Sequence, residues 1–399
     1  MRNFIIFTLV LFALAALLRI DFFFTIFYLF MAVYVVSRFW ARRVLKNLRI
    51  TRRFPERAFL GERLTVTLTV ENAGRLPVPW LLINEVFSSV LSSPPFFRRV
   101  FTLGGRARQT FEYDLTARRR GYYELGPLRV ETGDLLGINR GLNGAVAPNP
   151  LIVYPKIVPM ARLRLPAHSP QVVLPTPLPL FHDTSRIIGV KDYVPGENPR
   201  YIHWPATATH GRVLVKRFQT AIARDNAIFL DLNRAAYGRA GQANVAIELA
   251  VVVAASLAHA IVNREDLPVG LFAAGFDPLD GEVRYFAQPP NRGQAQLMTL
   301  LEILARVEGV DSAEDFAARV RQQSVHLPWG STLVIITGAE TADLLQTLLR
   351  LKKSGFKVAL VLAQPAAYLY PKSTPSRVPG LPVYRITAEK DIEQWQPIP

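Results

Sequence analysis

The chain has no cysteine among its 399 residues. Disulfide bonds, thiolate metal sites and a cysteine nucleophile are therefore excluded. Three motifs that indicate common chemistries are missing as well: the Gly-x-x-x-x-Gly-Lys-Ser/Thr phosphate loop, the Gly-x-Gly-x-x-Gly dinucleotide fingerprint and the Gly-x-Ser-x-Gly nucleophile turn. We therefore expect neither nucleotide binding nor serine-hydrolase chemistry from this chain.

Histidine is scarce, with six residues in the whole chain. His182, His203 and His210 lie nearest to one another in sequence, but their spacing fits no helical or strand pattern of metal ligands. We expect no metal cluster from them.

The net charge of +16 is concentrated toward the N-terminus. Residues 1–60 hold ten Lys or Arg and two Asp or Glu, whereas residues 226–399 hold sixteen and seventeen. A nucleic-acid binder would more often carry a basic stripe on one folded module. A basic gradient that begins at the N-terminus favours attraction to an anionic membrane surface, and nucleic acid is not an expected partner.

Two apolar runs, residues 3–18 and 22–37, are separated by Arg19-Ile20-Asp21. Each run is slightly shorter than the ~20 residues that cross a bilayer, and we interpret residues 1–40 as a transmembrane helical hairpin. The second run and the lack of a small-x-small cleavage site disfavour a cleaved signal peptide. Basic residues follow at once, so the positive-inside rule predicts a multi-pass protein of the cytoplasmic membrane with Met1 and residues 40–399 in the cytoplasm.

Residues 50–156 are predicted to form an all-β sandwich. Leu64 to Val70 alternates Thr with Leu and Val, the pattern of a half-buried strand, and turn signals recur about every ten residues. Further strands are expected at residues 80–87, 98–103, 109–116, 122–125 and 128–132. Arg118-Arg119-Arg120 is interpreted as a solvated edge rather than a phosphate site. Residues 157–188 are rich in proline and are expected to be an extended linker.

The C-terminal part alternates apolar strands with helices. Strands are expected at residues 227–231, 269–273, 332–337 and 357–362, and helices at 244–262, 294–307, 313–322 and 342–353. This alternation predicts a doubly wound α/β domain, whose ligand crevice lies at the carboxyl ends of its parallel strands. Asp231, Asn233, Thr337 and Glu340 should therefore lie near one another.

Residues 189–218 combine aromatic and cationic side chains around the turn at Pro195-Gly196. Glu197 and Arg200 are expected to form an ion pair or cap within that turn. Either the aromatics fill a seam between domains, or they form an interface with a partner; residue chemistry leaves both readings open. The binding residues that we single out are Lys191, Tyr193, Gly196, Glu197, Arg200, His203, Trp204 and Lys216.

The same stretch resembles a known family. Lys191-x-Tyr193-x-Pro195-Gly196-x-x-x-Arg200-x-Ile202-x-Trp204 is similar to the Arg-x-Tyr-x-x-Gly-Asp-x-x-Arg-x-Ile-x-Trp block of the bacterial and archaeal "domain of unknown function 58" proteins. Arg-Arg-Gly-Tyr-Tyr-Glu-Leu-Gly-Pro at 119–127, Gly-Asp at 133–134 and Val-Tyr-Pro at 153–155 also resemble that family. Lys191 and Glu197 replace the family's Arg and Asp, and Lys191 lacks the bidentate geometry of Arg.

The resemblance implies a membrane-anchored protein whose residues 189–399 end in a domain similar to the von Willebrand factor type A domain. It also implies a MoxR-type AAA+ ATPase partner and a role in assembling or maturing cell-envelope complexes. Type A domains hold Mg²⁺ through Asp-x-Ser-x-Ser with a Thr and an Asp from other loops. Here the loop reads Asp231-Leu-Asn233-Arg-Ala235, so the metal site is degenerate around Asp231, Asn233 and Thr337. No cofactor is expected, and weak Mg²⁺ binding is left only as an unexpected alternative.

Two function hypotheses follow from these patterns. The first is a non-enzymatic, cytoplasm-facing adaptor with no small-molecule substrate. The alternative is an envelope-associated hydrolase that uses Asp231 and Glu340 as paired carboxylates, for which a perturbed carboxylate pKa would be the distinguishing feature.

Overall fold

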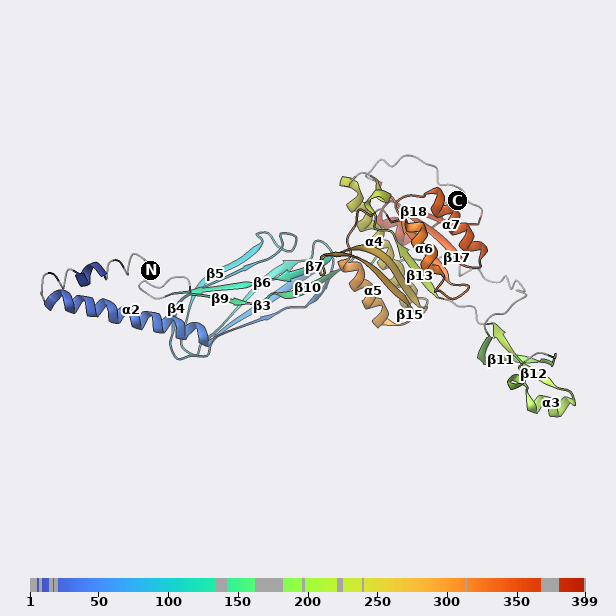
Figure 1. Ribbon diagram of the computed structural model, residues 1–399, viewed down its shortest axis with the longest axis horizontal. Helices are drawn as coiled ribbons and strands as arrows, with labels where there is room; N and C mark the ends of the chain where they lie inside the picture. The colour runs from blue at the N-terminus through green and yellow to red at the C-terminus, as the bar shows by residue number, and fades with distance from the viewer. Residues whose placement is uncertain are drawn as a thin grey trace. The chain divides into compact units, whose positions relative to one another are not determined.

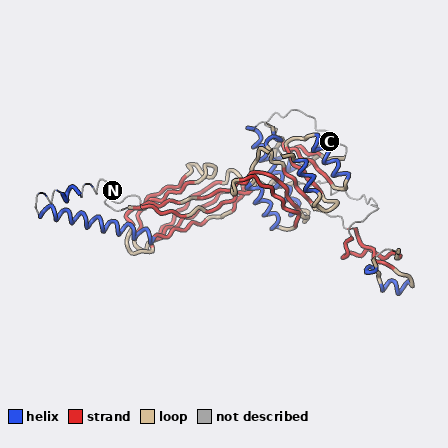
Figure 2. The backbone as a smooth tube through the Cα atoms, in the orientation of Figure 1, coloured by secondary structure: helices blue, strands red, loops and turns tan. Residues whose placement is uncertain are grey.

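A computed structural model describes residues 6, 9–13, 17, 21–133, 142–161, 182–195, 198–220, 225–238, 240–312, 314–366 and 380–397. The chain divides into two compact units. The first comprises residues 1–156 with 277–282 and 301–307, and the second comprises residues 157–276, 283–300 and 308–399. Figures 1 and 2 show a long N-terminal helix, a β-rich region and a mixed helix-and-strand region.

Helix α2, Asp21–Asn47, contains the second apolar run and continues through the basic segment that follows it. Residues 22–47 are long and apolar enough to cross a membrane, and none of the most apolar 18-residue window within them is buried in the structure. Most of the first run, residues 3–18, lies outside the described residues, so the hairpin stays a prediction. The helix continues past residue 40, where the predicted hairpin ends, and Val44 in this extension is buried.

Three sheets build the β region of the first unit. Their strand orders are β1-β3-β6, β2-β10-β7 and β5-β4-β8-β9. The strands are β1 (Leu48–Arg53), β2 (Arg57–Phe59), β3 (Arg63–Asn72), β4 (Val78–Val86), β5 (Phe96–Leu103), β6 (Arg108–Thr116), β7 (Gly121–Leu125), β8 (Leu128–Thr132), β9 (Leu142–Val146) and β10 (Asn149–Tyr154). Strand β3 alternates exposed and buried residues as its Thr/Leu/Val pattern predicts.

The inward side chains of β3 contribute to two cores. Leu68 and Val70 pack with Leu81 and Ile83 of β4, whereas Leu64 and Val66 pack with residues of β6, β7 and β10. The sheet that contains β3 is therefore covered by β4 and its neighbours along one part and by β7 and β10 along the other.

Arg120 corrects the interpretation of the arginine triplet as a solvated edge. Its guanidinium is buried in the first unit and donates hydrogen bonds to the carbonyl oxygens of Leu304, Ala305 and Val307, with Nη1 2.6 Å from the oxygen of Leu304. These carbonyls lie at the C-terminal end of helix α5 (Gln294–Arg306), where the last carbonyls lack partners within the helix. Arg120 thus caps this helix.

The predicted linker at 157–188 is too long at both ends. Val158 and Met160 are buried, and the backbone N–H of Val158 donates to Ser256 Oγ at 2.9 Å. At the other end, strand β11 (His182–Asp192) pairs with β12 (Leu214–Thr220) in a two-stranded antiparallel sheet. Between them lie the 3₁₀ turn η2 (Pro199–Tyr201) and helix α3 (Trp204–His210). Residues 162–181 lie outside the described part of the chain.

The second unit is organised around a six-stranded sheet of order β15-β14-β13-β16-β17-β18. The strands are β13 (Asn226–Leu230), β14 (Val269–Asp277), β15 (Glu282–Asn291), β16 (Thr332–Thr337), β17 (Lys357–Ala363) and β18 (Val383–Ile386). Strand β13 pairs in parallel with β14 and β16, and the series β16, β17 and β18 is also parallel. All residues of β13 and β16 are buried, as expected of parallel strands covered on both faces.

Helices cover the two faces of this sheet. Alternate strand residues such as Phe229 and Ile335 pack with helices α6 (Phe316–Ser324) and α7 (Ala342–Lys353). Helix α4 (Ala240–Asn263) contacts β13, β16, β17 and helix α8 (Glu389–Gln394). Helix α4 is apolar enough to span a membrane, but 78% of its apolar window is buried, so it belongs to the core of this unit.

Candidate functional site

Asp231 follows the buried strand β13 directly, at the carboxyl edge of the parallel sheet. Its side chain is 6% exposed, and both carboxylate oxygens accept hydrogen bonds. Oδ1 accepts from the backbone N–H of Asn233 at 3.0 Å, and Oδ2 accepts from Thr337 Oγ1 at 2.8 Å. Since Thr337 ends the neighbouring strand β16, the sheet itself brings these two side chains together.

The loop after Asp231 is held in one shape by its own side chains. Asn233 Oδ1 accepts from the N–H of Ala235, and its Nδ2 donates to Ser312 O at 2.7 Å. Tyr237, at the end of the 3₁₀ turn η3 (Arg234–Tyr237), donates its hydroxyl to Asp231 O at 2.6 Å. Gly338 lies so close that a Cβ there would be 2.4 Å from Tyr237 Cδ1, so only glycine fits.

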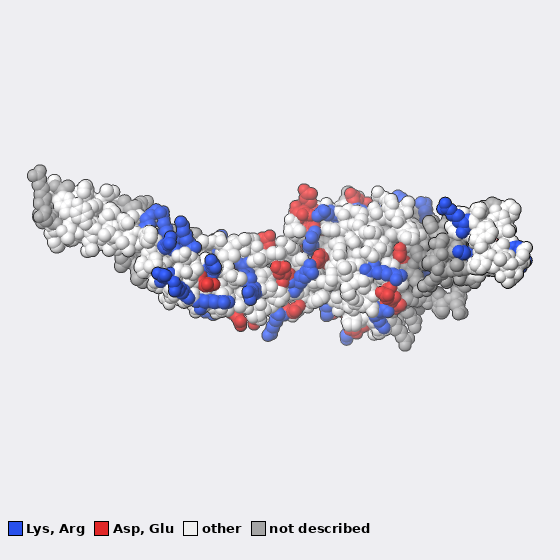
Figure 3. Space-filling view, turned by 90° about the horizontal axis from the view of Figure 1, so that it is seen from below, with Lys and Arg blue, Asp and Glu red and all other residues white. Residues whose placement is uncertain are grey.

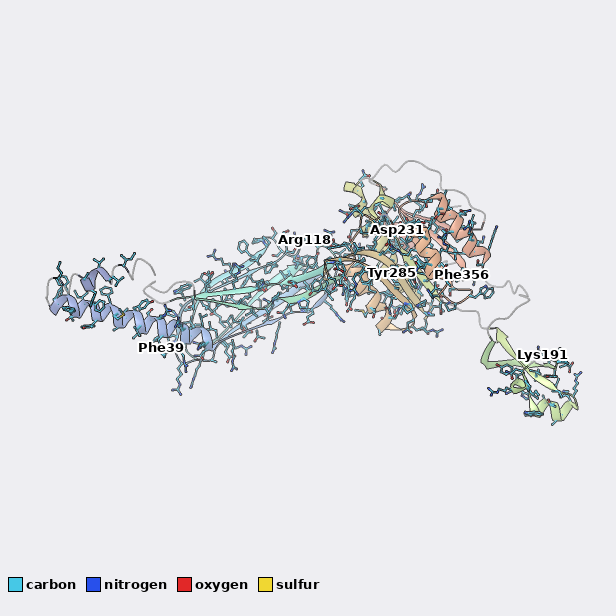
Figure 4. The ribbon with its side chains drawn as sticks, in the orientation of Figure 1. Phe39, Arg118, Lys191, Asp231, Tyr285 and Phe356 are labelled. Atoms are coloured by element: carbon cyan, nitrogen blue, oxygen red, sulfur yellow. The ribbon has the colours of Figure 1, made fainter. Side chains whose placement is uncertain are left out.

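A pocket of about 170 Å³ opens beside Asp231 within the second unit. Its walls come from the end of β13, from β14 and β15, from the loop before α6 and from α6 itself. Figure 4 shows Asp231 and Tyr285 within this region. The lining residues are Leu230, Asp231, Leu232, Asn233, Ala274, Val283, Arg284, Tyr285, Val310, Ser312, Glu314, Phe316 and Arg319.

Charges of both signs meet in this pocket. Burial raises the pKa of Asp231, although the hydrogen bonds from Asn233 and Thr337 and the positive charge of Arg319 oppose that shift. The Arg319 guanidinium forms an ion pair with Glu314 and lies 5.3 Å from the centre of the Tyr285 ring, in cation–π geometry. Burial also raises the pKa of Tyr285 to about 12. The pocket therefore offers one buried carboxylate beside a fixed guanidinium and a neutral phenol.

The side chains around Asp231 fit a Mg²⁺ ion poorly. The Asn233 amide is used by Ala235 and Ser312, and Ala235 has no oxygen in its side chain. No group of three His, Cys, Asp or Glu residues suited to a metal occurs among the described residues. The positive charge of Arg319 also acts on Asp231 and opposes the rise in its pKa that burial causes. Mg²⁺ needs several oxygen ligands in near-octahedral geometry, which this set does not supply.

Glu340, the second predicted carboxylate, does not line the pocket, and neither does Thr337. Arg234, which the sequence placed beside the metal loop, turns to Asp311 instead, with Nη1 2.8 Å from Oδ2. The structure therefore joins Asp231 with Thr337 and Asn233, and the charge that acts on Asp231 in the pocket is that of Arg319, whose ion pair is with Glu314. Neither Arg319 nor Tyr285 was singled out from the sequence, because nothing in a nine-residue amphipathic helix or an edge strand indicates which side chain faces a pocket.

The residues of the 189–217 block lie on the β11–β12 hairpin and its connection, where Figure 4 labels Lys191. Gly196 and Glu197 lie outside the described residues. His203 caps α3, since its Nδ1 accepts from the N–H of Ala206 at 3.1 Å. Lys191 and Arg200 are exposed, and Tyr193 and Lys216 are half-buried.

Trp204 is 67% exposed at the first position of α3. Three valines of the same hairpin and connection are exposed as well: Val190 by 40%, Val194 by 55% and Val213 by 44%. We call these four residues the hairpin apolar cluster. Leu214 and Val215 of β12 are buried, so the hairpin has a small interior of its own. The cluster offers apolar contact area that the described structure leaves uncovered.

Three comparisons with known proteins bear on this chain. The sequence model of the family described as "Protein of unknown function DUF58" matches residues 189–379. The "Uncharacterized protein YeaD" of Bacillus subtilis (strain 168) is 23% identical over 356 residues, which cover 85% of this chain and 81% of that protein.

Among solved structures, the CARDB domain of the PF1109 protein from Pyrococcus furiosus is 18% identical, with a TM-score of 0.21, over 27% of this chain and 86% of that domain. A complex of human zinc 2-glycoprotein and prolactin inducible protein is 14% identical, with a TM-score of 0.22, over 26% of this chain and 92% of the matched chain. TM-scores this low establish no shared fold. The chain is thus similar, over residues 189–379, to proteins described as being of unknown function.

Proposed function

We propose that this protein is a membrane-anchored, non-enzymatic adaptor that faces the cytoplasm and binds a protein partner through the hairpin apolar cluster. The observation that carries the proposal is the 67% exposure of Trp204 on a hairpin and connection that also expose three valines. Tryptophan exposed among apolar and cationic neighbours is typical of interface hot spots. Arg200 and Lys191, both exposed on the same segment, would add polar contacts around that apolar centre.

The membrane part of the proposal is supported by α2. Its surface exposes Phe22, Tyr28, Leu29, Val35 and Val36, an apolar exterior that suits lipid rather than water. The basic residues at its C-terminal end, with no acidic residue between Asp21 and Glu56, favour a cytoplasmic position for the rest of the chain by the positive-inside rule.

The proposed partner is a MoxR-type AAA+ ATPase, and the proposed process is assembly or maturation of cell-envelope complexes. Both come from the family resemblance. Similarity of the second unit to a von Willebrand factor type A domain is supported by Asp231, which follows the first strand of the parallel sheet. Its carboxylate accepts a hydrogen bond from Thr337 of the adjacent strand. With a donor set that suits Mg²⁺ poorly, the contact to the partner would be independent of metal.

The adaptor proposal is tested by affinity capture of the full-length protein from native membranes in mild detergent, with and without ATP and Mg²⁺. We expect an AAA+ ATPase to be recovered with the wild-type protein and lost with Trp204→Ala. Trp329→Ala is the matched control, since Trp329 is 45% exposed outside the hairpin. Equal recovery by both variants, or recovery of the protein alone under both conditions, would contradict the proposal. Circular dichroism of each variant checks that it is folded.

A second candidate function, an envelope-associated hydrolase, is favoured by one observation. Burial raises the pKa of Asp231 at the pocket, the feature expected of a general acid or base. The proposed partner carboxylate, Glu340, is not part of the pocket wall, which weakens a paired-carboxylate mechanism. Hydrolysis of envelope polymers by purified wild-type protein, abolished in Asp231→Asn, would support this function; a wild-type protein inactive on all of them would reject it.

A further inference from the structure

We propose that the end of the β region from which α2 emerges is a docking surface for the anionic lipid headgroups of the bilayer that α2 crosses. This inference rests on the membrane anchorage in the proposed function and adds which face of the β region meets the lipid. We call this surface the headgroup face. It comprises the last turns of α2 and the loops at residues 73–77 and 104–107, with five exposed cations: Arg42, Arg43, Lys46, Arg75 and Arg106.

Helix α2 is fixed to the β region without a linker. Strand β1 begins at Leu48, the residue after the helix ends. Val44 on the last turns of α2 is 1% exposed and packs with Leu68 and Val70 of β3. Trp40 packs against the same core and donates from Nε1 to Pro77 O at 3.0 Å. The direction of the helix therefore sets the orientation of the β region.

Two loops are held against the point where the helix ends. The N–H of Ala73 donates to Asn47 O at 2.9 Å, and the N–H of Arg106 donates to Gly74 O at 2.8 Å. The buried Asn72 side chain joins these loops by donating to Leu76 O and Gly104 O. A Cβ at Gly105 would be 2.1 Å from Arg75 O, so the close approach of the two loops requires glycine there.

The length of α2 places this face at the membrane surface. Phe22 to Ala41 are 20 residues with one charged side chain, Arg38. Such a helix is about 30 Å long, the thickness of the hydrocarbon core of a bilayer. From Phe39, which is 66% exposed, to the start of β1 the helix rises only about 13 Å. Arg42 and Arg43 lie about 4.5–6 Å beyond Phe39 along the helix, within one Debye length at physiological salt, about 8 Å, whereas the loop cations lie beyond that length and act on the headgroups with partial screening.

The charge of the headgroup face suits anionic lipid. Figure 3 shows Lys and Arg side chains gathered where α2 joins the β region. None of the five cations forms an ion pair with another residue of the described chain. Glu71, the acidic residue nearest in sequence to the loop at 73–77, is opposite Arg49 and Arg108 in the ladders of β3 with β1 and β6. Uncompensated cations next to an apolar helix are the pattern that attracts anionic headgroups.

The test uses the absence of native cysteine, which allows one thiol to be labelled. Full-length protein carrying Ala73→Cys, labelled with a fluorophore, is reconstituted into nanodiscs that contain headgroup-spin-labelled lipid. Ser89→Cys is the control position, because it is exposed in the β4–β5 loop, at the opposite end of the strands. Each protein is measured in phosphatidylcholine alone and with about 30% phosphatidylglycerol.

We expect strong quenching at position 73 and little at position 89, with more quenching at 73 when phosphatidylglycerol is present. Arg75→Ser with Arg106→Ser should reduce that increase, since each cation near an anionic surface changes the local affinity by up to about fivefold, while Arg42, Arg43 and Lys46 remain. Arg98→Ser with Arg99→Ser, two exposed arginines of β5 near its start, should leave it unchanged.

Two negative outcomes are distinguishable. If the protein resists alkaline extraction from the membrane but position 73 is quenched no more than position 89, the headgroup face is rejected and the anchorage stands. If alkaline extraction releases the protein, the proposed anchorage fails and this inference fails with it. Quenching at 73 that is unaffected by lipid charge or by the arginine substitutions would also reject the electrostatic docking.

Discussion

Arg52 and Glu85 form an ion pair inside the β region, with Nη2 2.5 Å from Oε1 and side chains 2% and 0% exposed. Tyr113 donates its hydroxyl to the other carboxylate oxygen of Glu85 at 2.6 Å, and Arg52 Nη1 donates to Leu125 O and to Asn149 Oδ1. Burial raises the pKa of Glu85, whereas the hydrogen bond from Tyr113 and the charge of Arg52 lower it. The charge of Glu85 therefore depends on these partners.

Removing one partner from this network leaves a buried charge. We predict that Arg52→Met lowers the free energy of unfolding of the β region by about 3–5 kcal/mol, the usual loss when a buried ion pair is broken from one side. Chemical denaturation monitored by fluorescence measures it. Arg53→Met is the matched control, because Arg53 is exposed on the same strand and should change stability by less than about 0.5 kcal/mol. Equal effects of the two substitutions would contradict the role of the network.

Asp231 gives a pH-dependent prediction. Because burial raises its folded pKa above 3.8, the folded state binds the proton more tightly than the unfolded state does. The contribution of Asp231 to stability is therefore greatest below pH 3.8 and falls as the pH rises toward its folded pKa. We predict that Asp231→Asn is more favourable relative to wild type at pH 7 than at pH 4, as measured by urea unfolding at both values. A difference that is constant with pH would show that the carboxyl is not perturbed.

At the scale of single elements, helix α6 carries both a capping residue, Asp315, and a pocket residue, Arg319. Asp315 accepts hydrogen bonds from the N–H groups of Ala317 and Ala318, and Arg319 one turn later lies over Tyr285. Side-chain oxygens at an N-cap satisfy N–H groups that have no partner within the helix. The cap therefore holds the helical turn that carries Arg319.

We predict that Asp315→Ala lowers the free energy of unfolding by about 1 kcal/mol, with a range of about 0.5–2. It should also increase hydrogen exchange at Ala317, Ala318 and Arg319, as measured by mass spectrometry. Asp315→Asn keeps the capping oxygen and should retain most of the stability. If the Asn variant loses as much as the Ala variant, the charge of Asp315 matters rather than its cap.

At the scale of the whole molecule, α2 is part of the β region as well as a candidate membrane span. Val44 is 1% exposed in the core shared by β3, β4 and β8, and Trp40 packs against it. A chain shortened to residues 38–399 keeps both side chains, whereas one shortened to residues 48–399 removes them and uncovers the core.

We predict that the 48–399 chain is less stable than the 38–399 chain by at least about 3 kcal/mol, since burying a Val or larger apolar side chain contributes about 1.5–3 kcal/mol each. Thermal and urea unfolding of the two chains in detergent-free buffer measures the difference. Equal stability would mean that the last turns of α2 do not stabilise the β region. The double variant Val44→Ala and Trp40→Ala in the 38–399 chain should reproduce most of the loss.

Sequence patterns anticipated the buried parallel strands well. The runs around Phe229, Val334 and Leu360 are continuous and apolar, so their strands needed no tertiary information. Strand β15 was missed because its edge position leaves it largely exposed and it includes Pro289 and Pro290, residues that usually argue against a strand. The last turns of α2 were not included in the predicted hairpin because its apolar run ends at residue 37, although Val44 and Trp40 continue the apolar stripe.

In the candidate site, too, some contacts were predictable from the sequence and others were not. The sequence alone determined that the strands run in parallel, and hence that Asp231 and Thr337, which follow or end adjacent strands, come close together. Only the tertiary structure decided that Arg319 and Tyr285, rather than Glu340, share the pocket with Asp231. The physical reason is the separation of the interacting residues along the chain. Strand and helix periodicity act over a few residues, whereas the contact of Asp231 with its pocket neighbours depends on how loops and a short helix pack after about 50 to 90 residues of intervening chain.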